Sequence, residues 1–232
     1  MSLLELENVY TSYGESSVLR GIDLTVEPGE IVALLGRNGA GKTTTLRTIL
    51  QLTPPHEGSV RFKNEEVTGM STYEVARRGI GWVPEERRMF AHLSVEENIR
   101  VAIKDQSDIE AEKQRAFEVF PKLEEFRDRE AGTLSGGEQQ MVAIARGLVG
   151  ANDLLLIDEP SEGLAPMIID RVAEALEEIA AETTVLLVEQ NFPLAVSLAE
   201  RFYIIDQGQC VDSGGTENLT EDDERVTRYL SA

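Results

Sequence analysis

The sequence predicts an α/β fold in which helices cover a largely parallel sheet. Short apolar runs alternate along the chain with segments of helical spacing, the pattern of strands joined by crossover helices. One of these runs is followed at once by a glycine-rich turn and a further helical segment. Residues 86–149 depart from the alternation, because they are charged and helix-like with no convincing strand pattern.

The individual elements follow from these patterns. Three alternating segments with turn signals predict a small antiparallel sheet at one edge, namely Leu4 to Tyr10, Val18 to Val26 and Ser59 to Phe62. Continuous apolar runs predict buried strands at Ile31 to Leu35, Ile80 to Val83, Leu154 to Ile157, Val185 to Val188 and Phe202 to Ile205. Helical spacing predicts helices over Lys42 to Leu52, Ile168 to Ala181 and Phe192 to Ala199.

The domain organisation is predicted to be simple. No linker rich in Pro, Gly or Ser divides the 232 residues, and no fixed-period repeat is visible. We therefore expect one domain over residues 1–232, with an α/β core formed by residues 1–85 and 150–232. Residues 86–149 are expected to form a helical subdomain inserted into that core.

The charge balance restricts the kinds of partner. Against 22 Lys and Arg the chain has 42 Asp and Glu, which gives a net charge of −20. Such a surface repels phosphate backbones and anionic lipids, so we expect no nucleic-acid partner and only local binding of phosphate. The 5 Lys and 17 Arg resemble the composition of proteins from a salt-rich cytoplasm (a halophile), although an ordinary solvated acidic surface is an equal alternative.

Cysteine, histidine and apolar content exclude other classes of site. Cys210 is the single cysteine, so neither an internal disulfide nor a cysteine-built zinc site is available. With only His56 and His92, a histidine-rich metal centre is not expected. The first residues lack the pattern of a signal peptide, and the apolar runs are far shorter than the roughly 18 residues of a spanning helix. We therefore expect a cytoplasmic protein that reaches a membrane through a partner.

Residues 36–43 match the complete pattern of a phosphate-binding loop, placed between an expected strand and an expected helix. Its glycines let successive backbone N–H groups converge on phosphate oxygens at the positive end of the helix. Lys42 is expected to reach the β- and γ-phosphates, and the Thr43 hydroxyl to bind Mg²⁺. A glycine-rich turn that only joins strand to helix is the alternative. The expected nucleotide-binding residues are Gly36, Arg37, Asn38, Gly39, Ala40, Gly41, Lys42, Thr43 and Thr44.

Two carboxylates, Asp158 and Glu159, follow the apolar run Leu154 to Ile157. Open α/β sheets bind ligands at the carboxyl ends of their strands, so both are expected near the phosphate loop. Asp158 can hold Mg²⁺, and Glu159 can orient or deprotonate the water that attacks ATP. By itself an acidic pair after a strand is more often a strand terminus or a helix cap. Together with the phosphate loop it predicts an ATPase site.

A third motif begins at Leu134 and reads Leu-Ser-Gly-Gly-Glu-Gln-Gln. Ser135 and two glycines at a helix start form a second anion cradle, although the same residues can be a simple N-cap. The motif resembles the LSGGQ signature of ATP-binding-cassette (ABC) ATPases. The resemblance implies a P-loop NTPase core of RecA type with antiparallel β and helical subdomains, and ATP and Mg²⁺ as ligands. It also implies a dimer in which Ser135, Gly136, Gly137 and Glu138 face the nucleotide held by the other subunit.

Shorter family motifs are also present, some of them altered. Tyr13 matches the aromatic residue that stacks on adenine, unless it is an ordinary strand aromatic. Glu85 stands where most members have the Q-loop glutamine, and its carboxylate can still contact Mg²⁺ or its waters. Gln190 replaces the switch histidine; its amide can bind a γ-phosphate but cannot become cationic, so Glu159 is the expected general base beside Lys42. Ala165 stands where the D-loop usually has Asp, so the cross-dimer contact of that Asp is lost.

Several of these departures occur together in one branch of the family. Residues 83–88, 93–98, 161–166 and 188–191 resemble the LivF-type ATPases of branched-chain amino-acid importers. The resemblance implies a peripheral ATPase at the cytoplasmic face of the membrane, with residues 85–98 beside the groove for the permease. Its partners would be multi-pass permease subunits, a sister ATPase or second copy, and an extracytoplasmic solute-binding protein. The alternatives are importers of urea or short-chain amides, lipopolysaccharide or lipid exporters, and soluble ABC proteins acting on ribosomes or in DNA repair.

Overall fold

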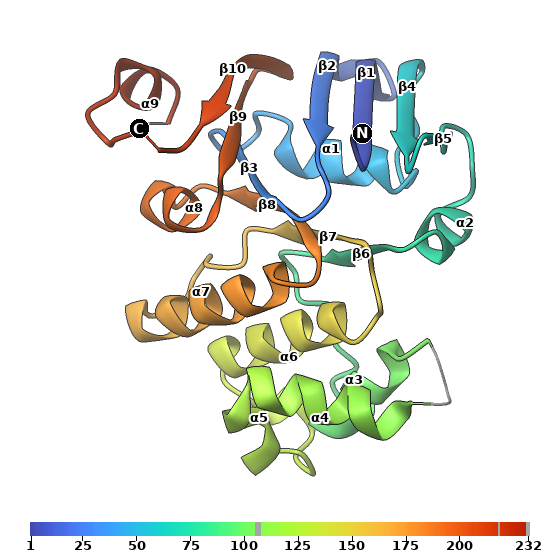
Figure 1. The fold of residues 1–232 in the computed structure, drawn as a ribbon, viewed down its shortest axis with the longest axis vertical. Coiled ribbons are helices and arrows are strands. Elements are labelled where there is room, and N and C mark those ends of the chain that lie inside the picture. The colour runs from blue at the N-terminus through green and yellow to red at the C-terminus, as the bar shows by residue number, and fades with distance from the viewer. Residues whose placement is uncertain (105–107, 218, 231–232) are drawn as a thin grey trace.

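The computed structural model describes residues 1–104, 108–217 and 219–230, which form two sheets with helices around them (Figure 1). The larger sheet has the strand order β10-β9-β3-β8-β7-β6, and every neighbouring pair is parallel except β9 with β10. The parallel strands therefore all end at the same edge. The strands are β3 (Ile31–Leu35), β6 (Ile80–Val83), β7 (Leu154–Asp158), β8 (Thr184–Glu189), β9 (Arg201–Asp206) and β10 (Gln209–Gly215).

The larger sheet confirms the expected parallel α/β core. All five predicted strands are present, with bounds within one residue of those expected. Every residue of β3, β7 and β8 is buried, as their continuous apolar runs predict. Strand β10 was not predicted, because it is polar and its residues alternate between exposed and half-buried.

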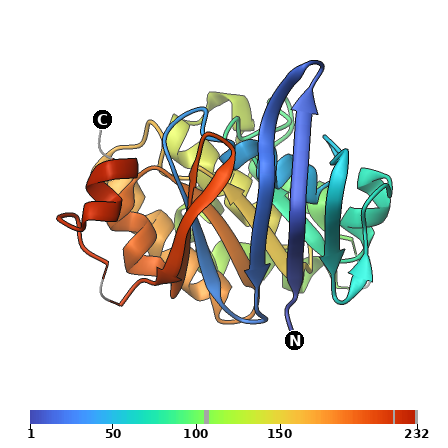
Figure 2. The same cartoon turned by 90° about the horizontal axis from the view of Figure 1, so that it is seen from above.

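The smaller sheet has the order β2-β1-β4-β5, and all its pairs are antiparallel. Its strands are β1 (Leu4–Tyr13), β2 (Ser16–Val26), β4 (Glu57–Phe62) and β5 (Glu65–Glu66). The prediction of an antiparallel sheet is confirmed, but its placement at one edge is wrong. The sheet lies across one face of the larger sheet, with helix α1 (Lys42–Ile49) between them (Figures 1 and 2). Each alternating strand has one apolar face, and this face is buried in a cluster shared with α1 and the larger sheet.

Nine helices are present among the described residues: α1, α2 (Thr72–Arg77), α3 (Val95–Ala102), α4 (Ile109–Val119), α5 (Pro121–Glu125), α6 (Gly136–Leu148), α7 (Pro166–Ala180), α8 (Phe192–Leu198) and α9 (Glu224–Tyr229). The described part of residues 86–149 has four of them, α3 to α6, and no strand, as expected. Helix α1 ends three residues before the predicted Leu52, because Gln51 takes a left-handed conformation with φ 57°. None of the described helices is long and apolar enough to cross a bilayer.

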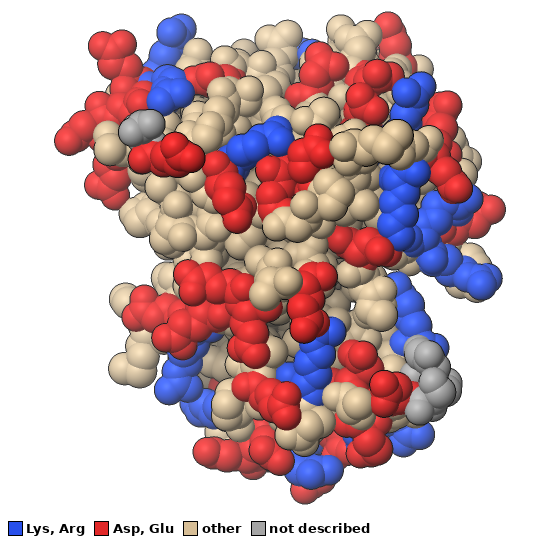
Figure 3. Space-filling view, in the orientation of Figure 1, with Lys and Arg blue, Asp and Glu red and all other residues tan. Residues whose placement is uncertain are grey.

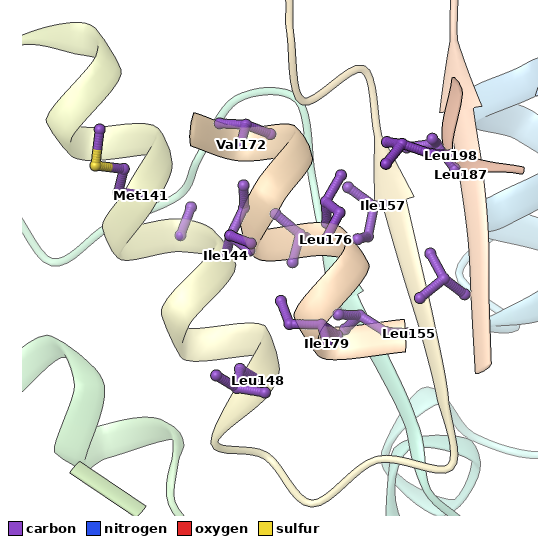
Figure 4. Close-up of a cluster of buried hydrophobic side chains, with 14 of the residues drawn as sticks. Met141, Ile144, Leu148, Leu155, Ile157, Val172, Leu176, Ile179, Leu187 and Leu198 are labelled. Atoms are coloured by element: carbon purple, nitrogen blue, oxygen red, sulfur yellow. The ribbon is translucent and has the colours of Figure 1, made fainter. Parts of the chain in front are cut away.

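Helices α6 and α7 cover the face of the larger sheet opposite the smaller one (Figures 1 and 4). Their apolar side chains meet those of β7 and β8, and full burial of one such side chain contributes about 1.5–3 kcal/mol. Gly147 allows close approach, because a Cβ there would lie 2.6 Å from Val83 on β6. The helix that begins at the signature motif thus packs against β6 and β7, and β7 ends at the acidic pair. The labelled side chains are Met141, Ile144, Leu148, Leu155, Ile157, Val172, Leu176, Ile179, Leu187 and Leu198 (Figure 4).

Candidate functional site

The phosphate loop joins β3 to α1 at the carboxyl edge of the larger sheet. At Gly36, a Cβ would collide with the carbonyl oxygen of Ile205 on β9. At Gly41, where φ is 118°, a Cβ would lie 2.9 Å from Leu19 on β2. Strands of both sheets therefore pack so close to the loop that a side chain at either position would clash, and glycine is required there. Helix α1 has no side-chain cap, so N–H groups of its first turn remain available to an anion.

Lys42 and Glu159 form a buried ion pair beside this loop. The Nζ atom lies 3.0 Å from the Glu159 carboxylate, and the two side chains are only 3% and 9% exposed. The ammonium also donates to the carbonyl oxygens of Gly36 at 2.8 Å and Arg37 at 3.3 Å. The ammonium therefore donates to carboxylate and carbonyl oxygens. Phosphate oxygens are acceptors of the same kind and carry more negative charge than a carbonyl oxygen.

Thr43 and Asp158 meet next to this ion pair. The Thr43 hydroxyl donates to the Asp158 carboxylate at 3.1 Å. Burial raises the pKa of Asp158 to about 6, with a contribution from Glu159, while the Thr43 hydrogen bond opposes the rise. Hydroxyl and carboxylate oxygens suit Mg²⁺, and a divalent cation would offset the cost of burying the charge. Among the described residues, no group of three or more Asp, Glu, His or Cys side chains could hold a metal ion.

A pocket of about 330 Å³ opens over the loop and brings together residues from distant parts of the chain. Glu85, which comes two residues after β6, is one of its lining residues, and its role toward Mg²⁺ stays a prediction. Glu162 also lines it, although sequence analysis gave it no role. Burial and the carboxylates of Glu85 and Glu159 raise the pKa of Glu162, so the pocket concentrates negative charge. The other lining residues are Val18, Asn38, Gly39, Gly41, Lys42, Thr43, Thr44 and Glu159.

Several predicted site residues do not line this pocket: Gly36, Arg37, Ala40 and Asp158, which belong to or adjoin the two motifs, and the more distant Tyr13 and Gln190. Tyr13 is at the β1–β2 turn, 43% exposed, and its hydroxyl oxygen accepts a hydrogen bond from Thr53 at 3.3 Å. Burial tends to raise the pKa of Tyr13, but hydrogen bonds with Thr53, Arg47 and Thr44 outweigh it, and the pKa is lowered. Gln190 directly follows β8 and is exposed. The stacking role of Tyr13 and the switch role of Gln190 stay predictions.

The signature residues form a cap at the start of α6. The Ser135 hydroxyl accepts from the Glu138 N–H at 3.4 Å, and the Glu138 carboxylate accepts from the Ser135 N–H at 2.9 Å. Burial raises the pKa of Glu138, but hydrogen bonds from Ser135 and Lys122 lower it to about 2. None of the residues 135–138 lines the pocket over the phosphate loop. Within one chain, the signature residues are therefore separate from the pocket over the phosphate loop.

A family model described as ABC transporter matches residues 19–162, which include the phosphate loop, the signature and the Asp158–Glu159 pair. The chain belongs to the ABC transporter ATP-binding family. This ABC ATPase is 43% identical over 212 residues to the high-affinity branched-chain amino acid transport ATP-binding protein BraG of Pseudomonas aeruginosa, covering 90% of this chain and 91% of that one.

Other relatives of this ABC ATPase are more distant. The probable branched-chain amino acid transport ATP-binding protein LivF of Archaeoglobus fulgidus is 33% identical, with 94% of each chain covered. The lipopolysaccharide export system ATP-binding protein LptB of Escherichia coli K12 is also 33% identical, covering 99% of this chain and 98% of that one. An ATP-binding cassette of an ABC transporter in its ADP conformation superposes with a TM-score of 0.82 at 26% identity, over 98% of both chains. The predicted ABC fold is confirmed, and the chain is an ATP-binding subunit of a family that hydrolyses ATP to power transport.

Proposed function

We propose that this ABC ATPase powers the uptake of branched-chain amino acids through separate membrane permease subunits. The observation that carries the proposal is the 43% identity to BraG over nine-tenths of both chains. The relative named for lipopolysaccharide export is 33% identical over a similar length, which makes export the second candidate. Uptake of urea or short-chain amides and action as a soluble ABC protein are less supported, because no named relative described above has those functions.

The geometry supports distinct roles for the residues around the loop. Lys42 and the N–H groups at the start of α1 would bind the phosphates of ATP, and Tyr13 would stack on adenine. Thr43 and Asp158, with Glu85 nearby, would hold Mg²⁺, which supplies positive charge to the transferring phosphoryl group. Glu159 would accept a proton from the attacking water, since its carboxylate lies at the pocket wall. Gln190 would donate a hydrogen bond to the γ-phosphate.

The separation of the two anion-binding motifs supports a dimer. A second copy or a sister ATPase would place its residues Ser135 to Glu138 opposite the phosphate loop, so two chains enclose two nucleotides. Within each chain, α6 links the helical segment 86–149 to the core through contacts with β6 and β7. We accordingly treat residues 1–85 and 150–232 as a core and residues 86–149 as a subdomain of one ABC domain.

A groove of about 370 Å³ beside residues 85–98 supports a docking site for the permease at the cytoplasmic face of the membrane. Two buried donors at this groove, Trp82 Nε1 and Arg146 Nε, have no hydrogen-bond partner in the described chain. The groove lining is mostly apolar and includes the basic side chains of Arg87, Arg88, Lys104 and Arg146, whereas carboxylates are spread over the face shown in Figure 3. A protein segment with acceptor groups fits this groove, and nucleic acid does not fit the acidic surface. A solute-binding protein would complete the importer.

Purification of the tagged chain from its native membranes in mild detergent tests the proposed function. We expect two multi-pass permease subunits and a sister ATPase or second copy to co-purify, as identified by mass spectrometry. Direct binding of leucine, isoleucine or valine to the accompanying solute-binding protein would then fix the substrate. Recovery of lipopolysaccharide-export components, or of ribosomal or DNA-repair proteins without permeases, would contradict the importer assignment.

Substitution of Gln190 by histidine tests whether this side chain acts on the γ-phosphate while contributing little to ATP affinity. Gln190 is exposed and outside the pocket over the phosphate loop, so Gln190→His is expected to leave ATP affinity within about twofold of the wild type. The turnover of the wild type should show no pKa that depends on residue 190, because an amide does not titrate. Equilibrium binding of a fluorescent ATP analogue and a pH profile of phosphate release measure both. A large loss of nucleotide affinity in Gln190→His would contradict this role.

A further inference from the structure

Glu189, the last residue of β8, is a buried carboxylate that binds two loops at once. It is 1% exposed. One carboxylate oxygen accepts the backbone N–H of Ser161 at 3.0 Å. The other accepts the Ser161 hydroxyl at 3.0 Å and the backbone N–H of Asn191 at 3.1 Å. Three donors from two different segments therefore converge on one side chain.

The first of these segments follows the proposed general base. Glu159 has a positive φ of 45°, and its N–H donates to the carbonyl oxygen of Val188 at 2.9 Å. Ser161 comes two residues later and accepts the N–H of Leu164 at 3.2 Å, which closes a turn. The end of β8 thus holds this segment twice, through the backbone of Val188 and the side chain of Glu189.

The second segment carries Gln190. Asn191 follows it and caps α8, because its side chain accepts the N–H of Leu194 at 3.2 Å. Gln190 is therefore held between Glu189 and a residue that Glu189 itself binds. Strand pairing places Glu189 opposite Leu35 at the end of β3, beside the start of the phosphate loop. The Glu189 carboxylate is not among the groups that line the pocket over the phosphate loop.

Packing alone does not explain why a carboxylate, rather than an apolar side chain, occupies the buried position of Glu189. Burial raises the pKa of this carboxyl and the nearby Glu159 adds to the rise, while the three donors oppose it. A buried charge close to a like charge is costly, and an apolar residue could fill the same space at the end of β8. Only a carboxylate offers two oxygen atoms that accept from Ser161 and Asn191 together.

We propose that Glu189 is a positioning residue that fixes the turn after Glu159 relative to the turn that carries Gln190. The inference rests on the proposed roles of Glu159 and Gln190 in ATP hydrolysis, and it is independent of the transported substrate. By holding both turns, Glu189 keeps the side chains of Glu159 and Gln190 at a fixed position relative to each other. Its side chain is buried and is not among those that line the pocket over the phosphate loop.

Glu189→Gln tests this inference in the complete transporter purified with its membrane subunits. The amide keeps the size of the side chain but has one acceptor oxygen, and its NH₂ group cannot accept the Asn191 N–H. We expect kcat for ATP to fall on the order of tenfold while KM and nucleotide affinity stay within about twofold, because the phosphate loop is untouched. Equal changes in kcat and KM, or an unchanged kcat, would overturn the proposal.

Two further variants separate positioning from folding. Ser161→Ala removes only the hydroxyl bond and should lower kcat less than Glu189→Gln; in the double variant the two effects should be less than additive, since they remove a shared contact. Additive effects would count against the proposal. If Glu189→Gln does not fold, Ser161→Ala alone still tests the proposal, because it should lower kcat and leave KM nearly unchanged. Glu200→Gln is the matched control, because its carboxylate accepts the Ile31 N–H at the start of β3, away from the site. It should change neither kcat nor KM.

Discussion

Replacement of Glu159 by glutamine is expected to abolish most ATP turnover while ATP still binds. The amide has the shape of the carboxylate and keeps an oxygen atom toward Lys42, which lies 3.0 Å from Glu159. It cannot accept the proton of the attacking water, and loss of a general base lowers the rate by about 10²- to 10⁴-fold. ATP should therefore remain bound, and the closed dimer should accumulate. Phosphate release measures the first effect, and size-exclusion chromatography with ATP measures the second.

The control for this variant is Glu174→Gln. Glu174 is exposed on α7, outside the pocket over the phosphate loop, so the same chemical change should leave turnover and dimerisation unaltered. If Glu159→Gln hydrolysed ATP at the rate of the wild type, Glu159 would not be the base. Because Gln190 cannot titrate, the base would then have to be sought among the other carboxylates of the pocket, Glu85 and Glu162.

The fold was predictable where its signal is local. The run Leu154 to Ile157 predicts a buried strand without knowledge of its neighbours, and the structure has β7 there. The alternating pattern of β1 predicts one buried face but does not say what covers it, and this is why the smaller sheet was placed at an edge. Strand β10 was missed because it is polar and at most half-buried, and helix α9 because it is short and largely polar.

The site shows the same division. The phosphate loop and the Asp158–Glu159 pair are each contiguous in the sequence, so the sequence predicts both motifs. The structure brings them together, because Lys42 of the loop pairs with Glu159 and Thr43 donates to Asp158. The surroundings of Glu189 depend on strand register, with Asp158 opposite Val188 and Leu35 opposite Glu189. Register is a long-range property, and no pattern within residues 184–191 reveals it. The position of Glu189 at the end of a core strand was the one available signal.

Replacement of Lys42 by methionine is expected to weaken ATP binding by about 10- to 150-fold, because hydrogen bonds to charged groups contribute about 1.5–3 kcal/mol. The nucleotide-free protein should also lose stability. Lys42 and Glu159 are nearly inaccessible to water, and removal of one partner of a buried ion pair costs about 3–5 kcal/mol. Titration with a fluorescent ATP analogue and urea unfolding measure the two effects. Lys63→Met is the control, since it breaks an exposed pair with Asp153 and should cost at most about 1 kcal/mol.

The two effects of Lys42→Met have different causes, and a second substitution separates them. Loss of stability comes from a Glu159 carboxylate left buried without its cation, so it should largely disappear when Lys42→Met is combined with Glu159→Gln. Loss of ATP affinity comes from the missing ammonium itself, so it should persist in the double variant. Equal destabilisation by Lys42→Met in both backgrounds would show that the ion pair contributes nothing to stability. Unchanged ATP affinity would show that Lys42 does not reach the phosphates, and the loop would then bind nucleotide through its backbone N–H groups alone.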